Sequence, residues 1–135
     1  RRPPAALVRA PDMGMSDAPF ASVSILNHSS RRALSRKIGQ DLDPRRFRGN
    51  LWLDGLAPWE EFDLVGKRLR VGEAELEVIE PIGRCRATEA NPETGRRDAG
   101  TLAALEDGWG HTEFGVYAMV RKSGQVAVGD SVALA

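Results

Sequence analysis

Residues 68–88 read RLRVGEAELEVIEPIGRCRAT, and this stretch holds a hairpin signal followed by the single cysteine of the chain. The pattern predicts strands at 68–71 and 75–80, which a tight turn at Gly72-Glu73 joins. Residues 84–88 are predicted to form a further extended piece. The stretch therefore predicts β-structure that runs up to and past the cysteine.

Short segments of the same kind recur on both sides of this stretch, separated by turns rich in glycine and proline. A short helix is expected to begin at Ser29 or Ser30 and to stop at Gly39, because glycine commonly ends helices. The other predicted elements are strands at 21–27, 51–53, 114–121, 125–128 and 131–134, with a hairpin about Ser123-Gly124, and a helix at 101–107 that ends at Gly108. This order predicts a mainly β fold, closed or sandwiched, with a few short helices.

The chain has 135 residues, which is enough for one domain with a hydrophobic core of its own. Four of its eight prolines lie within the first 19 residues. We interpret residues 1–16 as an N-terminal arm and residues 17–135 as the domain. Since the chain does not begin with methionine, we expect the arm to be a remnant of a missing N-terminal half.

Positive and negative side chains balance, with 19 Lys and Arg against 19 Asp and Glu. A net charge of zero argues against binding to a nucleic acid or an anionic membrane, which needs surplus positive charge. No apolar run approaches the roughly 20 residues of a membrane span, and we see no secretory signal. One cysteine without a disulfide framework suits a reducing compartment. We therefore expect a cytoplasmic protein that binds neither nucleic acid nor membrane.

Cys85 cannot form an internal disulfide, so its role is packing, metal ligation or sulfur chemistry. The reactive form is the thiolate, which nearby positive charge favours, and Arg84 and Arg86 flank the cysteine directly. In an extended strand both arginines point to the opposite face, unless the backbone turns at Gly83. From residue type alone, a small buried hydrophobic residue is the commoner interpretation of a free cysteine.

A basic turn, RRFRGN at residues 45–50, is the second candidate site. The planar guanidinium of arginine suits bidentate contacts with phosphate, and Gly49 allows a ligand to approach the backbone. The alternative is a solvated loop whose Phe47 enters the core. The two histidines, His28 and His111, have no metal-ligand spacing with each other or with the cysteine, which argues against a zinc site.

Taken together, these segments resemble a MOSC domain, the module named for the C-terminal part of molybdenum-cofactor sulfurases. The resemblance runs from about Asp17 to the C-terminus. The matching segments are SILNHSS at 24–30, RFRGN at 46–50, PWEE at 58–61, LRVG at 69–72, RC at 84–85 with Thr88 after it, NPETG at 91–95, FGVYA at 114–118 and VGDSV at 128–132. Gly49 stands where members of the family often have proline. The detailed resemblance is to the C-terminal part of MOSC-type reductases of N-hydroxylated compounds.

The resemblance implies a β-barrel and gives the matching cysteine, Cys85, the functional role. In the family this cysteine ligates molybdenum in the pterin cofactor or is proposed to carry sulfur, and a thiolate is a suitable soft ligand. Arg48 and Asn50 match positions that are implicated in binding the cofactor. By the same resemblance, the hydroxyls of Ser30 and Thr88 are further candidates for the pocket, and Arg84 for contact with the anionic dithiolene.

Three functions remain open on these grounds. The first is a molybdenum-cofactor oxidoreductase domain with Cys85 as the metal ligand, a small N-hydroxylated substrate, and a separate electron-donor protein. The second is a sulfur carrier that receives a persulfide on Cys85 from a separate cysteine desulfurase, since the pyridoxal-phosphate domain of the sulfurases is absent and this chain is not expected to bind that cofactor. The third is a non-catalytic binding domain, in which Cys85 is buried and unreactive.

Overall fold

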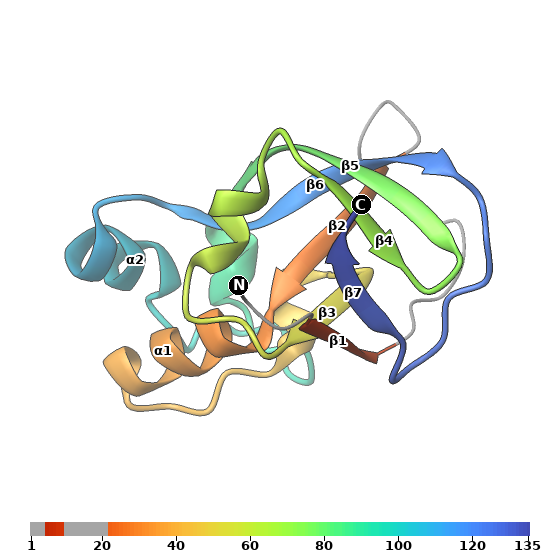
Figure 1. The fold of residues 1–135 in the computed structure, drawn as a ribbon. Coiled ribbons are helices and arrows are strands. Elements are labelled where there is room, and N and C mark those ends of the chain that lie inside the picture. The colour runs from red at the N-terminus through yellow and green to blue at the C-terminus, as the bar shows by residue number, and fades with distance from the viewer. Residues whose placement is uncertain (1–4, 10–21) are drawn as a thin grey trace.

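A closed β-barrel forms the body of the computed structural model, which describes residues 5–9 and 22–135 (Figure 1). The strands are β1 (Ala5–Arg9), β2 (Ser22–Asn27), β3 (Leu51–Asp54), β4 (Arg68–Val71), β5 (Ala74–Gly83), β6 (Glu113–Lys122) and β7 (Ser131–Leu134). The helices are α1 (His28–Ile38) and α2 (Thr101–Trp109), with short 3₁₀ helices η1 (Pro44–Phe47), η2 (Glu60–Leu64) and η3 (Arg86–Glu89). The predicted mainly β barrel with a few short helices is confirmed.

Around the barrel the strands follow the order β1-β3-β2-β6-β5-β4-β7, and β7 pairs with β1 to close it. Neighbouring strands are antiparallel except β2 and β3, which run parallel with Ile25 opposite Leu51. A parallel pair needs a crossover connection, and α1 and η1 lie within it. Figure 1 shows α1 and α2 together beside one end of the barrel. The crossover therefore places η1 at that end.

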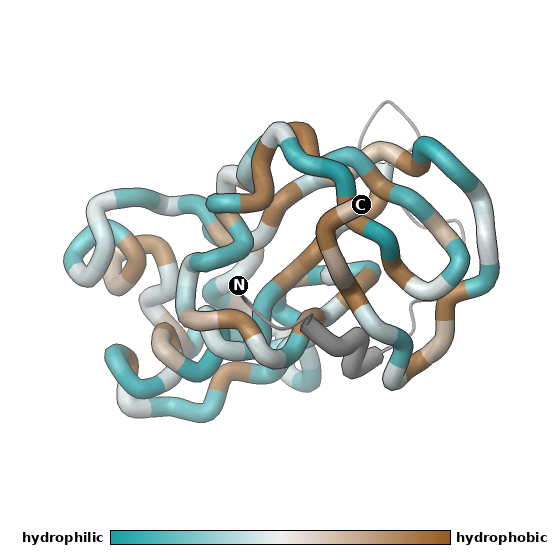
Figure 2. Tube along the Cα trace, in the orientation of Figure 1, coloured by the Kyte–Doolittle hydropathy of each residue, from teal (hydrophilic) through white to brown (hydrophobic). Residues whose placement is uncertain are grey.

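Apolar residues form two adjoining cores, and successive residues of a strand contribute to different ones. Ile25 belongs to the core inside the barrel, with Val78 and Val116 from β5 and β6. Leu26 belongs to the second core, which lies between the barrel and the helices and includes Trp52. Figure 2 shows hydrophobic positions along the strands and hydrophilic positions in many of the connecting loops.

The boundaries of α1 correct one prediction and confirm another. Asn27, not Ser29 or Ser30, caps the helix, because its side-chain oxygen accepts a hydrogen bond from the Ser29 amide at 2.9 Å. Gly39 ends the helix as predicted, in the left-handed conformation with φ of 81°. The second helix continues past the predicted stop at Gly108, and Gly110 is its C-terminal cap.

Two predicted strands are wrong. Residues 86–89 form η3, and the Cys85 carbonyl accepts hydrogen bonds from the amide and the hydroxyl of Thr88. Residues 125–128 form no strand, and the strands that pair with β6 are β2 and β5. Instead, the Gln125 carbonyl accepts a hydrogen bond from the Glu73 amide at 3.0 Å.

Strand β1 lies within the segment that the sequence predicts to be an N-terminal arm. It pairs with β3, where Leu7 lies opposite Leu53, and with β7, where Ala5 lies opposite Val132. Sequence reasoning missed this strand. The division into an arm at 1–16 and a domain at 17–135 stays a prediction. Within the part of the chain that the structure describes, no helix has the length and apolar character needed to cross a bilayer.

A buried carboxylate fixes η2 against the start of α1. Glu61 is completely buried, and the Ser30 hydroxyl lies 2.9 and 3.0 Å from its two oxygens. The side-chain amide of Asn27 donates to Glu61 at 3.0 Å. Burial raises the pKa of the Glu61 carboxyl, and the hydrogen bonds from Asn27 and Ser30 oppose this shift only in part.

The raised pKa of Glu61 predicts a pH-dependent stability. The folded protein binds this proton more tightly than the unfolded chain, so it carries more protons between the two pKa values and its free energy of unfolding falls as the pH rises there. The change is about 1.4 kcal/mol for each unit of pKa difference. Urea unfolding of the wild type and Glu61→Gln between pH 4.5 and 8 tests this. The wild-type free energy should fall relative to the variant with rising pH, and a constant difference would contradict the prediction.

Candidate functional site

Cys85 lies at the junction between β5 and η3, and its side chain is exposed. This junction is at the end of the barrel beside α1 and α2, where η1 also lies. Cys85 is the N-terminal cap residue of η3, and its carbonyl accepts hydrogen bonds from the Thr88 amide at 3.3 Å and the Thr88 hydroxyl at 3.1 Å. Interpreting this cysteine as a small buried hydrophobic residue is therefore wrong. The non-catalytic reading that requires a buried thiol loses its support.

Arg84 points into the protein while its neighbour Cys85 faces solvent. Its guanidinium lies over the rings of Phe47 and Phe114, 5.8 and 5.9 Å from their centroids. Arg84 Nε donates to the Phe114 carbonyl and Nη1 to the Phe47 carbonyl, each at 2.9 Å. The third nitrogen, Nη2, is buried and has no hydrogen-bond partner among the described residues.

Burial lowers the pKa of the Arg84 guanidinium to about 10, while the negative charges that Tyr117 and Cys85 can carry act in the opposite direction. The group is still a cation at neutral pH. A buried cation with an unpartnered N–H group is costly unless an anion or an acceptor approaches it. The arrangement therefore favours an anionic ligand.

The basic turn divides into side chains with different roles. Phe47 is completely buried, as the alternative of a core-anchored loop predicted. Arg46 is also buried, donating to the Glu89 carbonyl at 3.0 Å and to Asp98 at 2.5 Å, so it joins η1 to the segment after η3. Arg45 pairs with a neighbouring carboxylate. Arg48 is exposed and, unlike Arg45 and Arg46, makes no side-chain hydrogen bond or ion pair with another residue in the described ranges.

The backbone that presents Arg48 is held by Ser24 on β2. Arg48 adopts the left-handed conformation with φ of 50°. The Asn50 side-chain oxygen accepts a hydrogen bond from the Ser24 amide at 2.8 Å, and the Ser24 hydroxyl oxygen accepts from the Asn50 amide at 2.8 Å. A Cβ atom at Gly49 would lie 2.1 Å from Leu26 Cδ1, so a larger residue there requires the Leu26 side chain to move.

Two of the predicted site residues use their hydroxyls inside the protein. Ser30 is buried against Glu61, and it also accepts a hydrogen bond from the Trp59 amide at 2.8 Å. Thr88 is buried, with its hydroxyl 2.6 Å from that of Thr101 at the start of α2. Their role as cofactor ligands stays a prediction. What the geometry shows is that they fix α1 against η2 and η3 against α2.

Arg84 connects the remaining candidates. It precedes Cys85 in the chain and binds the carbonyl of Phe47, which precedes Arg48. Arg84 therefore links the segment that carries Cys85 to the basic turn that carries Arg48, about 35 residues away in sequence, and the role of these residues as one site stays a prediction.

Sequence reasoning missed Tyr117 as a neighbour of this site. It lies on β6 opposite Ser24 of β2 and Glu80 of β5, so the three side chains share one face of the sheet. Its phenol oxygen favours the cationic form of Arg84 when it is ionised. Its only sequence signal was membership of the FGVYA segment, because its position beside the site depends on the register of three strands.

The MOSC domain family model matches residues 13–133. The chain belongs to the MOSC domain family. Among curated proteins, it is 35% identical over 95 residues to the molybdenum cofactor sulfurase of Caenorhabditis briggsae, covering 69% of this chain and 13% of that protein. The corresponding protein of Drosophila grimshawi is 31% identical over 118 residues, covering 83% and 15%. This MOSC domain thus spans a small part of the length of these relatives.

Solved structures show the same fold at low sequence identity. YiiM from Geobacillus stearothermophilus superposes with a TM-score of 0.63 at 18% identity, covering 99% of this chain and 74% of that one. YuaD from Bacillus subtilis superposes with a TM-score of 0.65 at 20% identity, covering 82% and 61%. These likenesses confirm the barrel fold of the MOSC domain. The assignment of the candidate site depends on the residues of this chain alone.

The exposure of Cys85 predicts that its thiol reacts freely in the folded protein. We expect iodoacetamide to alkylate native Cys85 at a rate within about tenfold of the urea-unfolded chain, since no burial protects it. Cys85→Ser should change the free energy of unfolding by less than about 0.5 kcal/mol, as for other surface substitutions. Mass spectrometry and urea unfolding measure the two quantities. A thiol that reacts only after unfolding, or a loss of several kcal/mol in the variant, would contradict the exposed placement.

Proposed function

We propose that this MOSC domain binds the molybdenum cofactor where η1, η3 and the end of β5 meet, with Cys85 as the thiolate that contacts molybdenum. The observation that carries the proposal is the buried Nη2 of Arg84, next in sequence to an exposed cysteine and linked to the turn of the exposed Arg48. Neither Nη2 nor the Arg48 side chain has a polar partner among the described residues. Kinship with molybdenum cofactor sulfurases supports the choice of cofactor.

The donor set fits such a group in its chemistry. The cofactor combines a soft metal centre with an anionic dithiolene, a phosphate and pterin amides, so it needs a thiolate, positive charge and amide partners. Cys85 supplies the sulfur, while Arg84 and Arg48 supply guanidinium groups. Asn50 is proposed to contact the same ligand, from a loop that Ser24 fixes. Ser30 and Thr88 support the proposed site indirectly, because their hydroxyls hold α1 against η2 and η3 against α2.

The residues of the chain have distinct tasks in the proposed reaction, a two-electron reduction of an N-hydroxylated or related small molecule. The cofactor supplies the redox chemistry when it is bound. Cys85 binds and orients it, and Arg84 neutralises its negative charge from a side that water does not reach. Electrons come from a separate donor protein, because one cysteine cannot hold an iron–sulfur cluster. A reducing compartment, the cytoplasm, keeps the thiol free.

Molybdenum and pterin content per chain tests this proposal. Protein purified from a cofactor-replete host should contain close to one molybdenum per chain, and Cys85→Ser should abolish it because the metal loses its thiolate. Arg48→Gln should lower the content, whereas Arg68→Gln, an exposed arginine on β4, should leave it unchanged. Equal molybdenum in the wild type and Cys85→Ser would overturn the role of Cys85. Absence of both metal and pterin from the wild type would overturn the function.

A second candidate function is a sulfur carrier. The exposure of Cys85 and the kinship with sulfurases favour it. In this reaction the Cys85 thiolate attacks the outer sulfur of a persulfide on a cysteine desulfurase. The new S–S bond forms on Cys85 as the desulfurase cysteine leaves as a thiolate. An acceptor thiolate then attacks this outer sulfur, so the persulfide forms on the acceptor and Cys85 leaves as a thiolate.

Mass spectrometry after incubation with a cysteine desulfurase, its pyridoxal phosphate and L-cysteine tests the carrier. The expected result is a mass increase of one sulfur atom on Cys85 that dithiothreitol reverses. Cys85→Ser should show no increase in mass. In both samples the desulfurase should still carry its own persulfide. If the wild-type chain stays unmodified while the desulfurase carries its persulfide, the carrier function is excluded.

A further inference from the structure

We propose that Arg96 and Arg97 form a docking surface for an acidic protein partner, which reaches Cys85 across η3. The inference rests on the proposed function, because either version of it needs a second protein that delivers electrons or sulfur. It goes further by naming where that protein binds and which charge its surface carries.

The two arginines lie on a well-braced turn, residues 91–97, that begins where η3 ends. Arg97 forms a β-bridge with Ala90, and the Arg96 carbonyl accepts a hydrogen bond from the Asn91 amide at 2.7 Å. A 3₁₀ helix rises about 2 Å per residue, so the base of this turn lies about 10 Å from Cys85 along η3. A partner that contacts the turn therefore comes within reach of the thiol.

Positive charge around this turn is not compensated. Residues 43–50 and 84–98 contain seven arginines and four carboxylates, in a chain whose net charge is zero. Each of those carboxylates is already paired, in Arg45–Asp43, Arg45–Glu93, Arg46–Asp98 and Arg86–Glu89. Arg48, Arg96 and Arg97 are exposed and form no ion pair within the described residues.

Further carboxylates lie on β5 and β6 near the site. Glu113 faces Gly83 across the strands, and its side chain is half-buried. Glu80, opposite Tyr117 on the neighbouring strand, is another, and together the two offset two charges at most, so the region that surrounds Cys85 keeps a positive surplus. At about 0.1 M salt such charges act over roughly 10 Å, about the distance from the base of the turn to the cysteine.

The exposure of these arginines favours a protein over a small ligand. A single exposed ion pair contributes little free energy in water, so a small anion would bind weakly at the turn. A broad acidic surface gains from several such contacts at once, and the surplus charge speeds and orients its approach. A nucleic acid is the less favoured alternative, because its binding needs a larger surplus than a chain of zero net charge offers.

Protection of Cys85 from iodoacetamide tests the surface in protein purified from a host that does not make the cofactor, where no metal occupies the thiol; the reagent is uncharged and responds to coverage of Cys85. An oligoglutamate peptide serves as the probe for an acidic partner. At low ionic strength the peptide should slow the alkylation about fivefold, and 0.5 M salt should abolish the effect. The double variant Arg96→Gln/Arg97→Gln should lose the protection.

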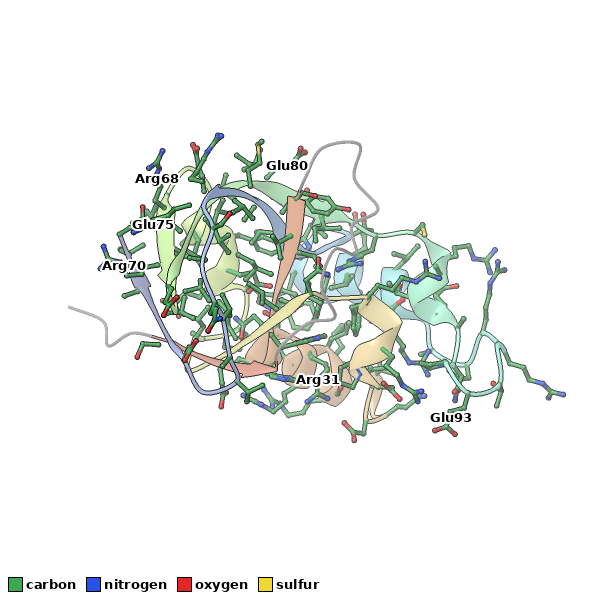
Figure 3. The ribbon with its side chains drawn as sticks, turned by 90° about the vertical axis from the view of Figure 1, so that its right-hand side faces the viewer. Arg31, Arg68, Arg70, Glu75, Glu80 and Glu93 are labelled. Atoms are coloured by element: carbon green, nitrogen blue, oxygen red, sulfur yellow. The ribbon has the colours of Figure 1, made fainter. Side chains whose placement is uncertain are left out.

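Arg68→Gln/Arg70→Gln is the matched control, because it removes the same charge from β4. Figure 3 shows Arg68 and Arg70 at the opposite end of the molecule from Glu93, which lies on the turn of Arg96 and Arg97. This variant should keep the full protection. Equal protection in both variants, or none in the wild type, would overturn the proposal.

Two further measurements separate this proposal from its alternatives. An oligonucleotide of the same net charge that protects Cys85 better than the peptide would overturn the acidic-protein partner in favour of a nucleic acid. Molybdenum content should be the same in Arg96→Gln/Arg97→Gln as in the wild type. A loss of molybdenum there would assign these arginines to the cofactor and overturn the docking surface, whereas failure of the cofactor proposal itself would appear in Cys85→Ser.

Discussion

Burial of the Arg84 guanidinium is the constraint around which the candidate site is organised. A cation removed from water needs hydrogen bonds and polarisable neighbours, and Arg84 finds them in the carbonyls and rings of Phe47 and Phe114. Those partners belong to η1 and β6, so one side chain links the crossover, the barrel wall and the segment that carries Cys85. Within residues 5–9 and 22–135 no group accepts a hydrogen bond from Nη2, which marks the place where a ligand acceptor would be most favourable.

Separate polar clusters give the site a rigid support. Glu61 with Ser30 fixes η2 and α1, while Thr88 with Thr101 fixes η3 against α2. Arg46 adds a charged link from η1 to the chain beyond η3. The loops at this end of the barrel are therefore held by buried hydrogen bonds rather than by regular secondary structure, which suits a surface that presents a few side chains in fixed positions.

Short-range signals in the sequence predicted most strands but not which strands pair with one another in the sheet. The hairpin at 68–80 could be predicted from the turn at Gly72-Glu73. The end of α1 could be predicted from Gly39, which follows the apolar face of the helix. The parallel pairing of β2 with β3 has no local signal, so neither the barrel order nor the place of β1 could be derived. Likewise, Cys85 was singled out by being the only cysteine, whereas the burial of Arg84 depends on Phe47 and Phe114, which are far away in sequence. The hydroxyls of Ser30 and Thr88 were assigned by pattern, and only packing showed which groups they contact.

The closure of the barrel between β7 and β1 bears on how the protein folds as it is synthesised. The strand that seals the sheet, Ser131–Leu134, lies between β4 and the strand nearest the N-terminus, so its pairing joins residues about 125 positions apart. Contacts of such long sequence separation form late, because the chain must first lose much of its freedom. While the ribosome still holds residues 131–134, β1 and β4 each keep an unpaired edge that other chains can join. Protection by chaperones therefore matters most in the interval just before these last four strand residues emerge.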